Sequence, residues 1–418
     1  MARVDAYLEK LHELEGSDLH LTTGVPAKVR VHGKLRAIGK EPLEKEQLAE
    51  LIDEILTERS RNIYSEHNDV DFAYEISDMA RFRVSAFVTR TGPGIVFRYI
   101  PQEILPLEEL RVPDVILKYT KLNSGLILVT GPTGSGKSTT LASLFDHINV
   151  NQKKHIITIE EPIEFVHQNK KSFFTQREIG VDSPTFSQAL RAATRQDPDV
   201  ILVGELRDPE TIALAITAAE MGFLVFATLH TNSAAKTVDR IIDVFPEEQQ
   251  NQVRTMLSVT LKGVCAQLLL PGKDGESRVP VNEILMGSFG LGNIIREGSV
   301  SKIVSLIESG GGEGMKKMDD AILERYKASE ISAETAYLFA QQKQRFEHLR
   351  DKKEDCGVPA SLSRVQDQQG SYRLISRVAH PPAWMRPAGM RGLRRPALLY
   401  LQPDQLRRRR RSQLPGCA

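Results

Sequence analysis

Cysteine is scarce in this sequence of 418 residues. The three that occur, Cys265, Cys356 and Cys417, form no C-x-x-C pair and are odd in number. This usage disfavours a framework of disulfides and a zinc site built on cysteines. It fits a protein of a reducing compartment.

Long apolar runs are also missing. The sequence contains no stretch of about 18 consecutive apolar residues, the length that a membrane-spanning helix requires. The opening segment MARVDAYLEKLHELEG carries charged and apolar side chains at helical spacing. It predicts an amphipathic helix rather than a signal peptide. We therefore expect any association with a membrane to be peripheral and to go through a partner.

The net charge is only +1, but the charged residues are unevenly distributed along the chain. The residues after Cys356 include twelve arginines and two aspartates but no lysine or glutamate, which leaves residues 1–356 mildly acidic. Aromatic residues make up only 6% of the chain. An acidic body without a basic, aromatic-rich groove disfavours direct binding to nucleic acid.

Hydrophobic patterning divides the rest of the chain into segments. Residues 1–100 combine helical patterns with short alternating strands, as in a small α+β domain, and the proline-punctuated residues 101–119 predict a linker. Residues 120–270 alternate short apolar runs with helical stretches. That pattern predicts an α/β core around a mainly parallel sheet buried on both faces. Residues 271–350 are expected to form a helical region.

The last segment, residues 351–418, differs in composition. It contains the only tryptophan and the run RRRRR at 407–411. Its lack of periodicity predicts disorder. One interpretation is a basic tail that binds acidic lipid or nucleic acid. The abrupt loss of lysine and glutamate favours the other, an artefact of the reading frame.

The most specific motif follows the apolar run GLILVT. Residues 131–138, GPTGSGKS, match the phosphate-binding pattern G-x-x-x-x-G-K-[ST] in full. Glycines let backbone N–H groups approach phosphate oxygens, and the helix that begins near Lys137 adds the positive end of its dipole. Lys137 is expected to contact the β- and γ-phosphates, and Ser138 to ligate Mg²⁺. The predicted ATP-binding residues are Gly131, Pro132, Thr133, Gly134, Ser135, Gly136, Lys137, Ser138 and Thr139.

Hydrolysis of ATP also needs a group that holds the metal or orients water. Glu205 follows the apolar run VILVG and would lie at the carboxyl end of a core strand, where parallel sheets place their ligands. It could bind Mg²⁺ through water, or it could be a surface carboxylate paired with Arg207. Glu160, Glu161 and Glu164 form a second acidic cluster, either part of a Mg²⁺–ATP site or a solvated turn.

Two further features lie where a predicted strand ends and where a predicted helix begins. His230 closes the apolar run LVFATLH, where a histidine can hydrogen-bond a γ-phosphate, although such a residue is more often structural. Asp208 and Pro209 predict a helix start, because aspartate is a good N-cap and proline fits the first helical position.

Four motifs follow one another along the chain. They are the phosphate-binding loop GPTGSGKS (the P-loop), the cluster of Glu160, Glu161 and Glu164 (the acidic box), DPDVILVGE and TLH. Their order resembles that of the type II/type IV secretion ATPase superfamily. Within it the chain is most similar to the type IV pilus retraction (twitching motility) ATPases. The likeness extends over about residues 1–347 and includes SDLHL, TQREIGVD and TLHTNSAAKTVDRIIDVFP. It implies an α/β protein with an N-terminal PAS-like α+β domain, then a RecA-like P-loop ATPase domain with a helical C-terminal region.

The resemblance also implies an activity and an assembly. Such proteins are cytoplasmic homohexamers that hydrolyse ATP with Mg²⁺ at the cytoplasmic face of the inner membrane. They drive pilus retraction through an inner-membrane pilus platform protein. In the site, Glu205 would be the Walker B-type glutamate, Glu164 a catalytic carboxylate and His230 the His-box residue. Arginines of the N-terminal region would approach the phosphates, and the candidates are Arg81, Arg83, Arg98 and Arg111.

Three positions depart from the family pattern. Glu161 stands where members usually have aspartate, Phe223 where many have a second histidine, and Gly292 where retraction ATPases have arginine in Ala-Ile-Arg-Asn-Leu-Ile-Arg-Glu. The last difference keeps an accessory retraction ATPase open as an alternative.

A non-catalytic nucleotide-binding regulatory ring and a nucleic-acid motor are the alternatives from other classes. The lack of a four-cysteine metal motif favours retraction over pilus assembly and secretion ATPases.

Overall fold

The computed structural model describes residues 2–31, 34–76, 79–100, 103–275, 277–350, 362–366 and 372–376. The chain divides into two compact units, Met1–Gly357 and Val358–Ala418. Within the described ranges no helix is both long enough and apolar enough to cross a membrane.

The N-terminal elements are α1 (Asp5–Glu13), β1 (Asp18–Thr22), β2 (Lys28–Val31), β3 (Lys34–Ala37), α2 (Lys45–Ile55), α3 (Glu58–His67), β4 (Asp69–Ile76), β5 (Ala80–Thr89) and β6 (Gly92–Ile100). The strands form one antiparallel sheet in the order β3-β2-β1-β6-β5-β4. Along β5, Ala80, Phe82, Val84 and Ala86 are buried and alternate with more exposed residues. This period of two places one face against the apolar side of α1 and α2. The predicted α+β character of residues 1–100 agrees with this arrangement, while α3 was not anticipated.

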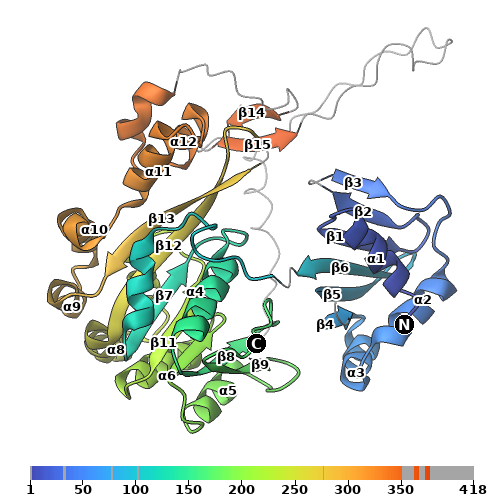
Figure 1. Ribbon diagram of the computed structural model, residues 1–418, viewed down its shortest axis with the longest axis horizontal. Coiled ribbons are helices and arrows are strands. Elements are labelled where there is room, and N and C mark those ends of the chain that lie inside the picture. Colours follow the sequence, from blue (N-terminus) through green and yellow to red (C-terminus); the bar gives the residue numbers. More distant parts are fainter. Residues whose placement is uncertain are drawn as a thin grey trace, which may run out of the picture. The chain divides into compact units, whose positions relative to one another are not determined.

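The following elements are the 3-10 helix η1 (Asp114–Lys121), β7 (Gly125–Thr130), α4 (Lys137–Asn151), β8 (His155–Glu160), β9 (Phe173–Glu178), α5 (Phe186–Ala193), β10 (Val200–Val203), α6 (Pro209–Glu220), β11 (Leu224–Leu229), α7 (Ala234–Asp243), α8 (Glu247–Thr260), β12 (Leu261–Pro271) and β13 (Arg278–Met286). The strands form a sheet in the order β13-β12-β7-β11-β10-β8-β9. All neighbours pair in parallel except β12 and β13. Figure 1 shows β7 within this sheet, between β12 and β11.

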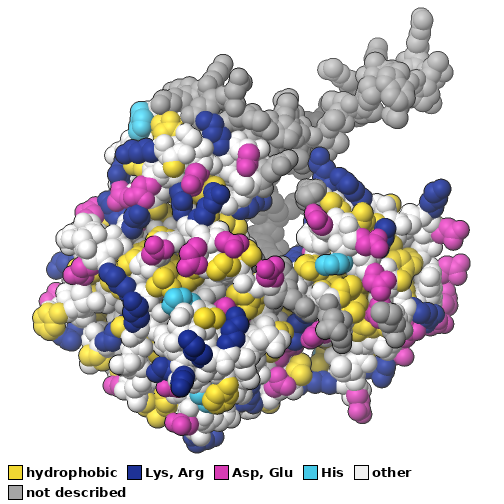
Figure 2. All heavy atoms as spheres, viewed as in Figure 1, with side chains coloured by type: hydrophobic (Ala, Val, Ile, Leu, Met, Phe, Trp, Pro, Cys, Tyr) yellow, Lys and Arg dark blue, Asp and Glu magenta, His cyan; other side chains and the backbone are white. Residues whose placement is uncertain are grey.

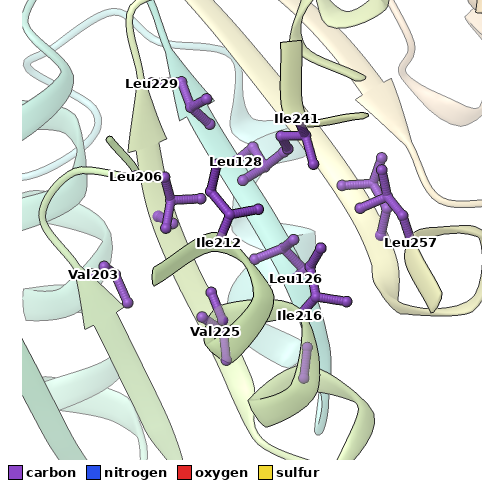
Figure 3. Close-up of a cluster of buried hydrophobic side chains, with 14 of the residues drawn as sticks. Leu126, Leu128, Val203, Leu206, Ile212, Ile216, Val225, Leu229, Ile241 and Leu257 are labelled. Atoms are coloured by element: carbon purple, nitrogen blue, oxygen red, sulfur yellow. The ribbon is translucent and has the colours of Figure 1, made fainter. Parts of the chain in front are cut away.

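The sheet is covered on both faces because its inner strands are largely apolar. On one face, Leu126 and Leu128 of β7 pack with side chains of α6, α7 and α8, among them Ile212, Ile241 and Leu257 (Figure 3). Alternate residues of the same strands pack on the other face against α4, η1 and the segment before it. Each fully buried aliphatic side chain contributes roughly 1.5–3 kcal/mol by leaving water. The expected two-sided α/β core is confirmed.

The prediction of helices from residue 271 onward is wrong for Arg278–Met286. These residues form β13, which pairs antiparallel with β12 at the edge of the sheet. Its sequence RVPVNEILM hides the strand, because Asn282 and Glu283 interrupt the apolar pattern. Beyond it the chain is helical, as expected, with α9 (Phe289–Arg296), η2 (Val300–Lys302), α10 (Ile303–Ser309), η3 (Gly310–Glu313), α11 (Met318–Lys327), α12 (Ala333–Phe339) and η4 (Lys343–Leu349).

The second unit contains two strands where the sequence indicated disorder. β14 (Leu362–Gln366) and β15 (Tyr372–Ser376) pair antiparallel. Both contain β-branched residues, Val365 and Ile375, which favour extended backbone. The arginine run at 407–411 lies outside the described residues.

Candidate functional site

Four loops meet at the carboxyl edge of the parallel strands. Strands β7, β11, β10 and β8 are neighbours that run in one direction. The P-loop follows β7, the acidic box follows β8, and Glu205 and His230 follow β10 and β11. Because parallel strands present their carboxyl ends at one edge, the sheet gathers motifs that are up to about 100 residues apart in sequence.

The P-loop has the backbone that a phosphate cradle requires. Gly134 and Gly136 adopt φ of 78° and 82°, in the left-handed region that favours glycine. Gly136 directly precedes α4, so the N–H groups of its first turn face the loop. The hydroxyl oxygen of Ser135 is buried and has no hydrogen-bond partner among the described residues. These groups fit the phosphates of a nucleotide.

Lys137 lies over the loop that it belongs to. Its Nζ donates hydrogen bonds to the carbonyl oxygens of Gly131, at 2.8 Å, and Pro132, at 3.2 Å. Burial lowers the pKa of Lys137, while the carboxylates of Glu205 and Glu164 act in the opposite direction. Both predicted catalytic carboxylates therefore act electrostatically on the P-loop lysine. These two hydrogen bonds to carbonyl oxygens are weaker than a bond to a charged acceptor, so an anionic phosphate can replace them as the partner of Lys137.

Glu205 is held at both of its carboxylate oxygens. Oε1 lies 2.9 Å from Nε2 of His230, and Oε2 lies 2.8 Å from Nη2 of Arg207. Burial raises the pKa of Glu205, but Arg207 and His230 together lower it below its ordinary value. The other nitrogen of the same guanidinium, Nη1, lies 2.8 Å from Glu161. Arg207 thus joins the end of β10 to the acidic box. Glu205 is therefore both a partner of Arg207 and a residue of the candidate site.

The acidic box is shaped by polar side chains of the edge strand β9. Gln176 donates to the carbonyl of Phe165, at 2.8 Å, and accepts from the N–H of His167, also at 2.8 Å. The carboxylate of Glu178 accepts from the N–H of Ile163, at 3.1 Å. Glu164 lies within the loop that these contacts fix. Burial raises the pKa of its neighbour Glu160 to about 7.

The candidate arginines of the N-terminal region divide into two groups. Arg83 and Arg98 pair with carboxylates of their own sheet, Asp71 at 3.5 Å and Asp18 at 2.9 Å. Arg81 also pairs within its sheet, with Glu75 at 3.6 Å, but it donates in addition to Glu178, with Nη2 2.7 Å from Oε2. Arg81 is thereby connected to the acidic box, whereas the other two contact none of the predicted site residues here.

A cavity of about 360 Å³ lies beside the first turn of α4. Thr139 and Gly136 contribute to its wall, and so do Arg111 from the segment before η1 and Arg278 from β13. This volume lies within the roughly 300–1,000 Å³ that is typical of small-molecule pockets, and it suits a nucleoside. Arg111, one of the candidate arginines, therefore lies near the end of the P-loop.

Sequence reasoning missed two residues of the site. Arg207 was considered only as a partner of Glu205, because nothing in sequence relates it to Glu161, 46 positions earlier. Gln267 contacts the P-loop from β12, and its signal was available: it is a lone amide inside the apolar run VCAQLLL. A buried polar group in such a run needs a specific partner.

The residues present fit a magnesium ion bound together with a nucleotide. No group of three or more His, Cys, Asp or Glu side chains is gathered for a metal among the described residues. Mg²⁺ commonly keeps several waters and uses only one or two protein ligands beside phosphate oxygens. The hydroxyl of Ser138 at the start of α4 and the carboxylate of Glu205 supply that number.

Acidic and basic side chains are interspersed on the face shown in Figure 2, rather than gathered by sign. Such a mixture is typical of an ordinary protein surface. A groove that tracks a nucleic-acid backbone would instead concentrate lysine and arginine.

Comparison with known proteins shows which family and which relatives the chain is similar to. The family model described as type II/IV secretion system protein matches residues 2–302. The type IV pilus retraction ATPase PilT of Pseudomonas aeruginosa is 49% identical over 320 residues, which are 77% of this chain and 93% of that protein. The type IV pilus ATPase PilU of the same organism is 40% identical over 333 residues, 80% of this chain and 87% of that protein. A crystal structure of the pilus retraction motor PilT with bound ADP has a TM-score of 0.77 and 41% identity, and the match covers 83% of this chain and 99% of that one.

Proposed function

The chain belongs to the type II/IV secretion system protein family, and from this premise we propose that it is an ATPase that drives retraction of a type IV pilus. The identity to the retraction ATPase PilT is 49%, against 40% to the pilus ATPase PilU, which favours a retraction motor like PilT. One structural observation carries the proposal: the P-loop with Lys137, the acidic box with Glu164, and Glu205 all follow parallel strands of one sheet and lie at its carboxyl edge.

The residues of the site divide the work of hydrolysis. P-loop N–H groups and Lys137 would bind the phosphates, and the cavity between Arg111 and Arg278 would hold the nucleoside. A magnesium ion held by Ser138 and, through water, Glu205 would neutralise charge on the phosphates. Glu205 and Glu164 would orient and polarise the attacking water, and His230 would hold Glu205 in position.

The assembly that we propose is a homohexameric ring of PAS-like and RecA-like domains. It would work in the cytoplasm at the inner membrane and act on a pilus platform protein. Arg81 is the best placed of the N-terminal arginines to couple the state of the phosphates to domain position, because it already contacts Glu178 beside the acidic box. Arg83 and Arg98 remain candidates that would have to leave Asp71 and Asp18.

Steady-state hydrolysis of ATP tests the enzymatic part. We expect the full chain to turn over ATP as a hexamer in light scattering. Lys137→Ala and Glu205→Ala should each lower kcat by at least about 100-fold, as expected for the removal of groups that act on transition-state charge. Lys154→Ala is the matched control, because Lys154 pairs with Asp199 at the opposite edge of the sheet. A hexamer that binds ATP without turnover would instead support the regulatory ring.

Complementation tests the biological part. The test strain is a bacterium whose own retraction ATPase has been deleted and which has been checked to have lost twitching. The full chain should restore twitching, whereas Glu205→Ala at equal abundance should not. Turnover in vitro without any restoration would contradict pilus retraction while leaving the ATPase intact.

A further inference from the structure

We propose that Gln267 is a positioning residue that holds the P-loop in its phosphate-binding conformation before nucleotide arrives. The proposal rests on the proposed function, since it concerns the same nucleotide site. Gln267 lies in β12 and is 2% exposed, so its amide must find its partners inside the protein.

The side-chain amide contacts both the loop and the helix that follows it. Nε2 donates to the carbonyl oxygen of Ser135 at 2.7 Å. Oε1 accepts from the hydroxyl of Thr140, in the first turn of α4, at 3.0 Å. Because a carbonyl oxygen can only accept, the Ser135 contact fixes which end of the amide faces the loop. One buried side chain therefore ties the last part of the loop to the helix whose N–H groups complete the phosphate site.

Gln267 also lies close to two glycines of the motif. A Cβ at Gly131 would lie 2.2 Å from the main-chain oxygen of Gln267, and a Cβ at Gly136 would lie 2.9 Å from its Nε2. At Gly134, in contrast, a Cβ would meet nothing within 4 Å. The loop thus rests on Gln267 at both of its ends, and its middle is left open for a ligand.

A second amide holds the first. Asn282 of β13 is the direct cross-strand partner of Gln267, and its Nδ2 donates to Oε1 of Gln267 at 3.0 Å. Asn282 is 1% exposed. With Thr140 and Asn282 both donating to Oε1, the amide of Gln267 cannot rotate without leaving buried donors unpaired. The β12–β13 hairpin therefore serves as the base of the P-loop.

An apolar replacement separates positioning from packing. Gln267→Met keeps most of the volume but removes both hydrogen bonds to the P-loop and α4, so the empty loop should occupy other conformations. Nucleotide must then restore the loop when it binds, which raises Kd and KM while kcat at saturation stays nearly the same. Two buried hydrogen bonds of ordinary strength correspond to a rise of roughly tenfold in the Kd for fluorescent ADP.

Hydrogen exchange in nucleotide-free protein provides a readout that does not depend on activity. The backbone amides of Gly131 and of residues 133–136 should exchange faster in Gln267→Met than in the unmodified chain. Leu270→Ala is the matched control: Leu270 is fully buried three positions along β12 and packs with the C-terminal helices. It should lower Tm without changing the Kd or the exchange of the loop. Thr140→Val, which removes one contact isosterically, serves if Gln267→Met does not fold.

The outcomes separate this inference from the proposed function. A Kd within twofold of the unmodified value, together with unchanged exchange of these loop amides, would overturn the role of Gln267. Failure of the unmodified chain to bind nucleotide would overturn the proposed function instead. In that case faster loop exchange in Gln267→Met would still support the positioning of the loop.

Discussion

Nη2 of Arg207 lies 2.8 Å from Oε2 of Glu205, and Nη1 of the same residue lies 2.8 Å from Glu161. The guanidinium links Glu205, which follows β10, to Glu161 of the acidic box. With His230 on the other oxygen, both sides of the Glu205 carboxylate are occupied. The glutamate is therefore charged and oriented, and in the proposed mechanism it would have to exchange a partner for water before acting on the γ-phosphate.

Removal of Arg207 should shift the pH dependence of hydrolysis. The pKa of Glu205 is lowered in the folded protein by Arg207 and His230, against burial. In Arg207→Ala it rises, so the acidic limb of the kcat profile should move to higher pH. Because Arg207 is more than half exposed, its ion pair is worth at most about 1 kcal/mol, and kcat near pH 8 should fall by about fivefold or less.

The control for Arg207 is Arg191→Ala, which breaks an exposed pair with Glu210 of the same 2.7–2.8 Å length. It should leave the pH profile unchanged. An acidic limb that stays in place in Arg207→Ala would mean that Glu205 does not set it.

His230 should act through Glu205 rather than through nucleotide binding. Its Nε2 can donate to Oε1 of Glu205, and the side-chain amide of Gln can replace that donor. We expect His230→Ala to lower kcat by roughly tenfold with little change in KM, and His230→Gln to retain most of the activity. The double variant with Arg207→Ala should lose less than the product of the single effects, because both residues hold one carboxylate. A rise in KM alone would point to a direct contact with the nucleotide.

Glu160 should make stability depend on pH. Burial raises its pKa to about 7 from the ordinary 4.5, so between these values the folded state keeps a proton that the unfolded state releases. Stability then falls as pH rises through this window, by at most about 3 kcal/mol, and the loss is complete above pH 7.

Glu160→Gln isolates that contribution. Relative to the unmodified chain, the variant should gain stability on going from pH 5 to pH 8, as measured by urea unfolding. Glu210→Gln, a change at an exposed carboxylate, should show no such pH-dependent difference. A constant difference between the two proteins at both pH values would show that Glu160 titrates normally.

The sequence predicted those parts of the site that depend on residues close together in the chain. The P-loop begins α4 at Lys137, and Asp208 caps α6, accepting from the N–H of Thr211 at 2.8 Å, with Pro209 at the first position, as expected. Each depends on residues only a few positions apart. The bridging role of Arg207 and the support from Gln267 depend on contacts across 46 and 132 positions, which no local pattern encodes.

The missed strand has the same cause. β13 carries Asn282 and Glu283 at its centre, and both are buried because each satisfies a distant element. Asn282 donates to Gln267, while Glu283 accepts from the N–H groups that begin α7 and α11. Read alone, two adjacent polar residues argue against a buried strand. Their partners become visible only when the sheet has formed.

The departure at Gly292 provides the last prediction, because two glycines in α9 have opposite surroundings. A Cβ at Gly292 would lie 2.7 Å from the main-chain oxygen of Ser258 in α8, whereas a Cβ at Gly290 would meet its nearest atom, in Leu306, at 3.5 Å. Alanine favours helix over glycine by about 1 kcal/mol at both positions. Gly290→Ala should therefore gain about 0.5–1 kcal/mol, while Gly292→Ala should lose about 1–3 kcal/mol through the clash with α8.

Thermal and urea unfolding of the two variants measure this difference directly. If it is found, the arginine of the family motif cannot enter position 292 unless α9 moves away from α8, so the glycine follows from the close packing of these two helices. Gly292→Arg should then lose more stability than Gly292→Ala. An equal gain in both alanine variants would show that α8 and α9 are not held at this distance in solution, and close packing would no longer explain the missing arginine.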